Sequence, residues 1–376
     1  MAKRSLALVE CFAEVVDPRI ERTKRHLLSD ILALSVLAVI AGAEGWEDIA
    51  EFGRQKQGWL KQCLRRPHGI PSHDTISRLF RALKPAEFHA ALTAWMESLH
   101  QHLGLKLVAI DGKTVRRSHD RGRMKSALHL VCAWSVTNHL VLGQEATDAK
   151  SNEITAIPEL LKLLELQGAL ITSDAMGCQK EIARQIIDGG GDYVLAVKEN
   201  QPKLHAALAT HFAGVHETHR TDGTVRRLTT RDQAHGRREQ RDYYVTPLPD
   251  SLQALRADWK QLTSLGQAIN ITHRDGREVS EVRYYILSQA PRVKAFAAAV
   301  RGHWGIENSL HWVLDVTFRE DECRIRKDHG PENFATLRRT ALSLIQRDSS
   351  KGSIKKKRKR AGWNNQALLS IVQQTI

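Results

Sequence analysis

Cysteine is scarce in this chain of 376 residues, and long apolar runs are absent. The five cysteines are odd in number, scattered, and never spaced as a CxxC pair. This pattern excludes a disulfide framework and a zinc ribbon, and it suits a reducing cytoplasm. The longest apolar run, Ile31 to Ala43, has thirteen residues and is broken at Ser35, whereas a bilayer span needs about 20. Because no basic-then-apolar leader begins the sequence, we expect a cytoplasmic protein without a membrane partner.

Acidic residues are also in deficit. Lys and Arg number 56 against 42 for Asp and Glu, which gives a net charge of +14. The run Lys355 to Arg360 supplies six of these charges, and 14 − 6 = 8 remain in the rest of the chain. A basic surface favours polyanions, of which nucleic acid is the commonest. We therefore expect a nucleic-acid partner and a place at the nucleoid; a basic protein with no such partner is the alternative.

Residues 1–100 are expected to form a small helical domain. The expected helices run from Ser29 or Asp30 to Ala43, from Trp46 to Leu64, and from Ser72 to Pro85. The third has an apolar face of Ile76, Leu79, Phe80 and Leu83, with Arg78 and Arg81 off that face. It is either a DNA-reading helix or a packed helix of the domain, and the sequence leaves both open.

Short β-rich runs and helices alternate from about residue 105. Strands are expected at 105–110, 128–136, 140–144, 169–173 and 193–197, with helices at 151–166 and 178–188. The order β-β-β-α-β-α-β is that of the ribonuclease H-like fold, an α/β fold with helices on both faces of a mixed sheet. Its first and fourth strands are parallel neighbours, and ligand sites in such sheets gather at strand carboxyl ends.

The predicted catalytic domain spans residues 101–350 and contains a β-rich insertion at about 203–289, where charged and β-branched residues alternate. Helical periodicity returns from Arg292 to about Val313 and again from Glu332 to Arg347. Residues 351–376 are predicted to be a basic C-terminal tail. Two interpretations of its basic run stay open, a grip on phosphates and a disordered segment.

Three acids stand out in this arrangement. Asp111 and Asp174 each follow an expected strand, and Glu307 lies on the later helix. His303 and His311 flank Glu307 at four-residue spacing, which would place all three on one helix face. Each residue alone has a plainer explanation, because an Asp after a strand is often a turn former and Glu307 could pair with Arg301 or His303. The hypothesis of a site depends on the set.

Such a set suits metal-dependent phosphodiester chemistry. Cleavage needs an activated water or hydroxyl and a neutralised leaving oxygen, and two divalent cations about 3.5–4 Å apart can supply both. Magnesium prefers hard oxygen ligands, so carboxylates fit and thiolates do not. We predict that Asp111, Asp174 and Glu307 are catalytic and bind Mg²⁺ or Mn²⁺, as two ions, without an organic cofactor.

The motifs around these acids resemble those of the H-repeat-associated, ISAs-type insertion-sequence transposases of the DDE superfamily. The N-terminal likeness lies in Ile31 to Phe52 and Pro71 to Phe80. The first catalytic block is Ala109 to Arg116, the second Lys150 to Thr155 with Thr172 to Gln179, and the third His303 to Val316. Intermediate blocks are Tyr193 to Gln201 and His235 to Arg237. The likeness covers nearly the whole chain.

This resemblance implies a DNA transposase that cuts the ends of an insertion sequence and joins the 3′ hydroxyl to target DNA. Its partner would be double-stranded DNA at element ends and target, bound by a homodimer. The candidate DNA-binding residues are Lys113, Arg116, Lys198, Arg301, Trp304, Asn308, Arg324 and Arg326. Related transposases carry a Tyr and an Arg before the Glu and a basic residue after it. Here those places hold Val300, His303 and Leu314, so phosphate contacts are not transferred to them.

Two other functions compete with this one. A catalytically silent relative would bind DNA and leave it uncut, and a cleavage assay separates the two. A mononuclear metal hydrolase could use His303, Glu307 and His311, but the His-Glu-x-x-His pattern of zinc proteases is absent. Tightly bound zinc after purification would favour that second alternative.

Overall fold

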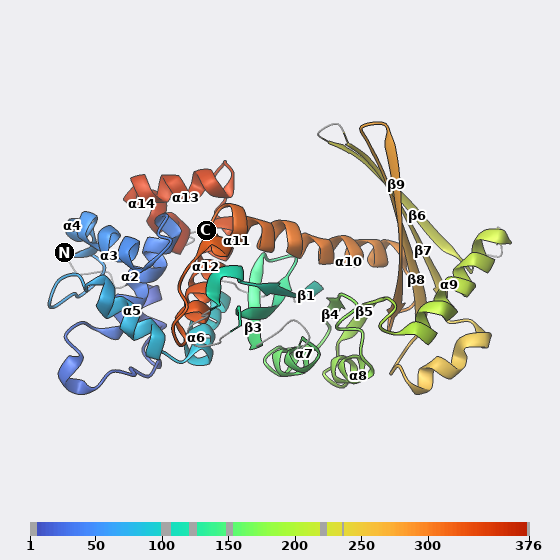
Figure 1. Cartoon of the computed structure of the whole chain (residues 1–376), viewed down its shortest axis with the longest axis horizontal. Coiled ribbons are helices and arrows are strands. Elements are labelled where there is room, and N and C mark those ends of the chain that lie inside the picture. The colour runs from blue at the N-terminus through green and yellow to red at the C-terminus, as the bar shows by residue number, and fades with distance from the viewer. Residues whose placement is uncertain are drawn as a thin grey trace.

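The computed structural model describes residues 6–98, 107–119, 126–147, 153–218, 224–234 and 237–373. The molecule is elongated, with the N-terminal and C-terminal helices at one end, a mixed sheet in the middle and a long-stranded β arm at the other end (Figure 1). No single helix in the described ranges is long and apolar enough to cross a membrane. Only the bent pair Leu28–Ala41 and Trp46–Gln55, at 93°, passes that test of length and composition together.

The N-terminal region is helical, as predicted. Its helices are α1 (Ala7–Glu10), α2 (Leu28–Ala41), α3 (Trp46–Gln55), α4 (Gln57–Leu60), α5 (His73–Ala82) and α6 (Pro85–Ser98). The expected caps of α2 are wrong, because Asp30 lies inside the first turn and accepts hydrogen bonds from the backbone N–H of Arg65 and Arg66. The expected helix 46–64 breaks into α3 and α4 at Lys56. The helix expected from Ser72 is confirmed as α5, Ser72 caps it, and its apolar face is fully buried.

The central sheet has the predicted ribonuclease H-like order. Its strands are β1 (Leu107–Thr114), β2 (His129–Ser135), β3 (Leu140–Thr147), β4 (Leu170–Ser173) and β5 (Asp192–Val197), and its helices are α7 (Glu153–Lys162) and α8 (Lys180–Asp188). β1 pairs in parallel with β4, as expected. Helices α7 and α8 cover one face while α10 (Val293–Ile306) crosses the other (Figure 1). The expected start of α7 at Ser151 lies outside the described residues.

The insertion is β-rich but not purely β. It begins with α9 (Pro202–Glu217), which the alternation of charged and β-branched residues did not predict, and continues with β6 (Arg226–Ala234), β7 (Arg237–Pro247), the 3₁₀ segment η5 (Asp250–Ala257), β8 (Ser264–Arg274) and β9 (Arg277–Leu287). Strand β9 pairs antiparallel with β5. The four inserted strands therefore extend the central sheet to the order β3-β2-β1-β4-β5-β9-β8-β7-β6.

The helix expected at 292–313 is interrupted. After α10 the chain makes a π-helical segment, η6 (Glu307–His311), before α11 (Trp312–Val316). Where α10 crosses the sheet, a Cβ on Gly302 would lie 2.4 Å from the Leu107 side chain on β1. This close approach explains the glycine and brings the end of α10 over β1 and β4.

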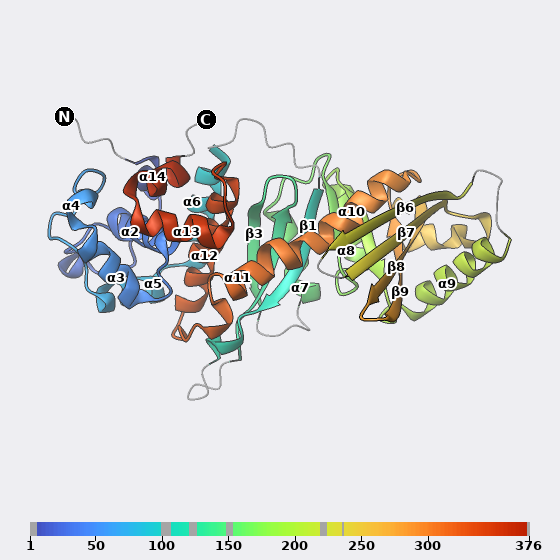
Figure 2. The same ribbon diagram turned by 90° about the horizontal axis from the view of Figure 1, so that it is seen from above.

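The C-terminal segment is not a tail, and that prediction is wrong for the described residues up to 373. After α12 (Gly330–Arg347), α13 (Ile354–Trp363) and α14 (Asn365–Gln373) pack against α2 (Figure 2). Two of the six basic residues in the run, Lys357 and Arg358, are buried and donate hydrogen bonds to main-chain carbonyls. The run therefore forms an ordered helix because part of it belongs to the core.

Candidate active site

Two of the three predicted acids lie side by side at one edge of the sheet. The parallel pairing of β1 and β4 ends at Ile110 and Ser173. Asp111 and Asp174 directly follow these two residues in the sequence. Asp174 follows its strand, as expected. Asp111 does not, because β1 continues pairing with β2 as far as Thr114. At Asp111, β1 is therefore no longer paired with β4 but is still paired with β2.

The local structure fixes both carboxylates. The Asp174 carboxylate accepts hydrogen bonds from the backbone N–H of Met176 and Gly177, at 3.0 and 3.4 Å, which is an Asx-type turn. One Asp111 oxygen accepts from the N–H of Gly112 at 2.9 Å. The Asp111 side chain is 18% exposed, so it opens to solvent through a small part of its surface.

The electrostatics of Asp111 show that acids gather around it. Burial raises its pKa to about 7, and the charge of Asp174 adds to the rise, with smaller contributions from Glu153 and Glu307. The N–H of Gly112 acts in the opposite direction. A carboxyl with a pKa near neutrality, next to other acids in a recess, is typical of functional sites. The charges of Asp174 and Glu307 therefore both act on Asp111.

Glu307 is exposed and is the first residue of the π-helical segment. Single π turns are rare and occur frequently at functional sites. The turn also alters the expected stacking of Glu307 with its two histidines. His303 Nδ1 lies 3.2 Å from Thr172 Oγ1 on β4, and His311 Nδ1 lies 3.5 Å from Asp111 Oδ2 on β1.

Both histidines are neutral at pH 7. Burial lowers the pKa of His303 to about 4 and that of His311 to about 3. Neither ring therefore neutralises the acids. Divalent cations prefer hard oxygen ligands, and the three carboxylates are ligands of that kind. Within the described ranges, however, no three His, Cys, Asp or Glu side chains stand close enough together to hold a metal ion.

A fourth acid, Glu153, is part of this neighbourhood and was missed as a site residue. It is 2% exposed on the first turn of α7, and its Oε1 lies 2.7 Å from His129 Nε2 on β2. His129 Nδ1 in turn lies 2.8 Å from Thr114 Oγ1. A Cβ on Gly112 would come within 2.3 Å of Glu153 and 2.5 Å of His129. The available signal was its place within the motif Lys150 to Thr155, but burial and pairing cannot be seen in a motif.

Lys113 does not present its charge to a ligand. It is 8% exposed, and its Nζ lies 2.7 Å from Asp315, 3.2 Å from Asp321 and 3.6 Å from Glu320. Glu320 is fully buried and also binds Arg339 at 3.0 Å. An internal ion-pair network uses these charges to hold β1 against the segment after α11.

Three other predicted DNA-binding residues share a wall with Glu307. Arg301, Trp304 and Asn308 line a cavity of about 240 Å³ together with Glu307 and residues of β7, β8 and β9. The Arg283 guanidinium lies 3.8 Å from the centre of the Trp304 ring, a cation–π contact. The cavity thus joins the π segment to the inserted arm.

The remaining candidates are dispersed. Lys198 is exposed just after β5, and Arg116 is exposed and pairs with Asp321. Arg324 is exposed and lines a different pocket that contains several acids of the α2–α3 loop and α3. Arg326 is half-buried and donates to the Arg117 carbonyl. The structure does not gather these four into one surface.

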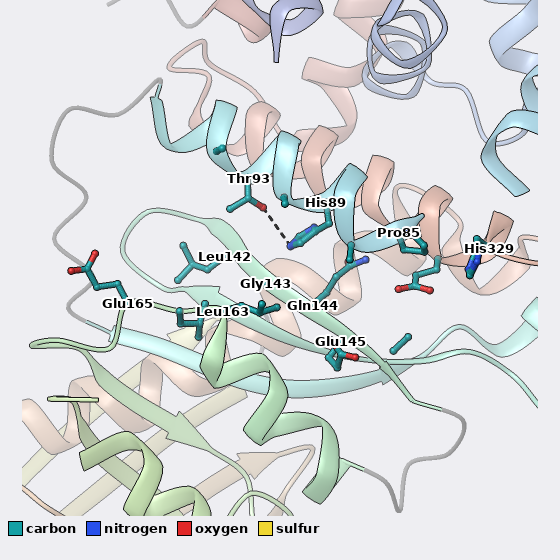
Figure 3. Close-up of a pocket in the computed structure, with 16 residues that line it drawn as sticks. Pro85, His89, Thr93, Leu142, Gly143, Gln144, Glu145, Leu163, Glu165 and His329 are labelled. Atoms are coloured by element: carbon teal, nitrogen blue, oxygen red, sulfur yellow. Dashed lines mark hydrogen bonds between the residues drawn. The ribbon is translucent and has the colours of Figure 1, made fainter. Parts of the chain in front are cut away.

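A separate cavity of about 710 Å³ lies between α6 and the outer edge strand β3 (Figure 3). His89 points toward Thr93 there, and burial lowers the pKa of His89 to about 4. None of Asp111, Asp174 and Glu307 lines it. This cavity is therefore distinct from the carboxylate site.

A mixed sheet in this order, covered by helices on both faces and extended by a β insertion, defines the ribonuclease H-like class of catalytic domains. Residues 102–344 match the family described as "Transposase DDE domain", and residues 9–96 match the associated family "DDE_Tnp_1-associated". The chain therefore belongs to the DDE transposase family.

Relatives of similar length support this membership. The chain is 40% identical over 370 residues to the "H repeat-associated putative transposase YhhI" of Escherichia coli (strain K12), covering 97% of each chain. It is 43% identical over 364 residues to the "Putative transposase YncI" of Escherichia coli O157:H7, covering 95% of this chain and 92% of that one. A piggyBac transposase in a synaptic complex with hairpin DNA aligns with 98% of this chain and 78% of its own, at 11% identity and a TM-score of 0.43. That last similarity is too low to inform function.

Proposed function

We propose that this protein is a metal-dependent DNA transposase that cuts the ends of an insertion sequence and joins the freed 3′ hydroxyl to target DNA. The observation that carries the proposal is the placement of Asp111 and Asp174 at the shared edge of β1 and β4, with Glu307 raising the Asp111 pKa from the helix above. Membership of the DDE transposase family agrees with it. The partner would be double-stranded DNA, held at two ends by a homodimer.

The proposed reaction has two phosphoryl transfers. Water first attacks a phosphorus at the element's end, a P–O bond breaks, and the departing oxygen becomes the 3′ hydroxyl. That hydroxyl then loses its proton and attacks a target phosphorus in line, and the target's 3′ oxygen leaves and takes up a proton, so that one P–O bond replaces another. Positioning and charge neutralisation would supply most of the catalysis.

Asp111, Asp174 and Glu307 are the residues that would hold two Mg²⁺ or Mn²⁺ ions. When bound, such ions activate the attacking oxygen and neutralise charge on the phosphate. The donor chemistry fits, because all three side chains are carboxylates, the hard oxygen ligands that Mg²⁺ and Mn²⁺ prefer. His303 and His311, kept neutral by burial, would wall the site without competing for the phosphate.

The test is cleavage of a DNA duplex that carries the element's end, found as inverted repeats outside the coding region. With Mg²⁺ or Mn²⁺ the wild-type protein should cut it, and Asp174→Ala should not. Asp111→Asn and Glu307→Gln should still bind this DNA in a gel shift without metal, since they lose a carboxylate and no phosphate contact. Wild-type rates in Asp174→Ala would refute the assignment.

One observation favours a second candidate, a catalytically silent DNA-binding relative. No three potential metal ligands among the described side chains are gathered closely enough to bind an ion as they lie. Absence of cleavage with intact binding would support this candidate. The mononuclear hydrolase loses support, because His303 and His311 face different strands instead of one shared point.

A further inference from the structure

The end of the chain concentrates positive charge without acids. Residues 349–376 contain seven Lys or Arg and no Asp or Glu. Six of the seven lie on α13, whose first turn is capped by Ser353. Cations near a helix N-terminus oppose its dipole, and like charges four residues apart, such as Lys355 and Lys359, repel one another. The helix therefore carries an electrostatic cost that a bound polyanion would relieve.

Buried contacts hold α13 rigidly in place. Arg358 donates to the carbonyls of Val39 and Ala43 at the end of α2, at 3.2 and 3.1 Å, and to Thr317 at 2.6 Å. Its guanidinium also stacks 4.3 Å from the Phe318 ring centre. The Val39 carbonyl also accepts from the N–H of Gly42, so Arg358 adds a second donor there and ties α13 to the end of α2. The negative charges of Glu44 and Asp48 stabilise the Arg358 guanidinium.

The outer side of α13 is free of such contacts. Lys355, Lys356 and Lys359 are exposed, and no hydrogen-bond or ion-pair partner for their ammonium groups is found in the part of the chain that the structure describes. Arg360 is exposed but bonds Ser350 and the Lys351 carbonyl. We call Lys355, Lys356 and Lys359 the α13 basic face.

Helix α13 lies on the same side of the molecule as α10 and α11, which precede and follow the π segment that begins at Glu307. Seen from above, α13, α11 and α10 follow one another toward the β arm (Figure 2), and all three lie above the sheet in the side view (Figure 1). The bond from Arg358 to Thr317 ties α13 to the residue that directly follows α11. Helix α13 therefore lies beyond α11 on the side of the molecule that carries the π segment.

We propose that the α13 basic face binds the phosphate backbone of duplex DNA beside the cleavage site. This inference rests on the proposed function and extends it to a surface outside the carboxylate site. Duplex DNA carries one charge per about 1.7 Å of axis, so it can satisfy several fixed lysines at once. A rigid helix fixes the register of the duplex without reading its sequence.

The test removes the three charges and leaves the buried anchors intact. The triple variant Lys355→Gln, Lys356→Gln, Lys359→Gln is compared with wild type in gel shifts on the element-end duplex over a range of salt. Affinity should fall at least about tenfold, and the slope of log affinity against log salt should become shallower by about two to three. The midpoint of thermal unfolding should stay the same or rise slightly, because the substitutions remove repulsion among the lysines.

The matched control removes the same charge from the opposite side. Lys162→Gln, Lys180→Gln, Arg184→Gln neutralises three exposed residues of α7 and α8, which lie below the sheet in Figure 1. It should bind almost as wild type does. Equal loss in both triple variants would overturn the inference, because only net charge would then matter.

A charge-preserving variant guards against misfolding as the cause. Lys355→Arg, Lys356→Arg, Lys359→Arg should keep the wild-type affinity, and a loss as large as that of the glutamine variant would overturn the inference. Binding of wild type to phosphatidylglycerol vesicles that the glutamine variant alone loses, with DNA affinity unchanged, would overturn it in favour of a lipid partner. If wild type fails to bind DNA at all, the proposed function fails first.

Discussion

At the residue scale, Gly112 shows how little room there is beside Asp111. We predict that Gly112→Ala loses about 1–3 kcal/mol of unfolding free energy, because its Cβ would displace the buried Glu153–His129 pair. Cleavage should fall at least about tenfold, since misplacing a reacting group by an ångström is costly. Thermal unfolding and the cleavage assay measure both effects.

The control for that change is Gly214→Ala. Gly214 lies inside α9 and has open space where a Cβ would go, so both quantities should stay near wild type. If Gly112→Ala behaves as Gly214→Ala does, the pair does not support the position of Asp111.

Asp111 gives a prediction that depends on pH. Folded Asp111 keeps its proton up to a pKa of about 7, whereas the unfolded chain releases it near pH 4. The unfolded state therefore binds fewer protons between these values, and the metal-free protein loses stability as pH rises from about 4 to about 7. Asp111→Asn mimics the neutral form, so it should stabilise the metal-free protein at pH 8 by up to about 4 kcal/mol.

The measurement is denaturant unfolding of both proteins in a chelator at pH 5 and pH 8. The stability gap should be larger at pH 8. Asp250→Asn, at an exposed position at the start of η5, should show no such change. A gap that shrinks toward pH 8 would mean that Asp111 is not held among like charges.

Motifs identified the acids but not the state of their neighbours. Asp111 and Asp174 could be placed because both follow runs of strand-forming residues. Lys113, two residues after Asp111, was assigned to DNA, yet it is buried among three carboxylates. The burial of Lys113, like that of Glu153, depends on segments far away in the chain. A local pattern carries no information about such partners.

At the scale of elements, the strand order was predictable because each strand is short, β-rich and bounded by turns. The π turn was not predictable. Four-residue spacing assumes an uninterrupted α-helix, and one extra residue per turn leaves no mark in composition. The joining of β9 to β5 was equally hidden, since it pairs strands separated by the whole insertion.

The π segment leads to a prediction of its own. Deleting Ser309 should restore an ordinary helix, because a π turn behaves as one inserted residue in an α-helix. Residues on either side would then rotate relative to one another, and Glu307 and His311 could not both keep their present directions. We expect the variant to fold and bind DNA but to cut it at least about 100-fold more slowly. Ser309→Ala, which keeps the residue count, should cut normally, and normal cutting by the deletion variant would show that the turn is incidental.

At the scale of the whole molecule, the two ends of the chain form one body. Helices α13 and α14 pack on α2, and Lys56 of the N-terminal region binds Asn365 at 2.8 Å. Composition suggested the opposite, because a run of six basic residues is commonly solvated. The deciding contacts join Arg358 to the carbonyls of Val39 and Ala43, which are more than 300 residues away in the sequence.

A truncation tests whether α13 and α14 stabilise the N-terminal helices. Removing residues 353–376 would take the Arg358 donor away from the carbonyls of Val39 and Ala43 and expose apolar side chains of α2 and α12 that α13 and α14 contact. Loss of this apolar burial and of these hydrogen bonds lowers the free energy of unfolding, so we expect the truncated protein to unfold at a clearly lower temperature. Amide hydrogen exchange should accelerate in α2 before it does in β1 or β4, because α13 and α14 pack on α2 and α12. If this truncation weakens DNA binding but leaves the melting temperature and the hydrogen exchange of α2 unchanged, α13 and α14 do not stabilise α2. The proposal that buried contacts fix α13 for DNA binding would then be wrong.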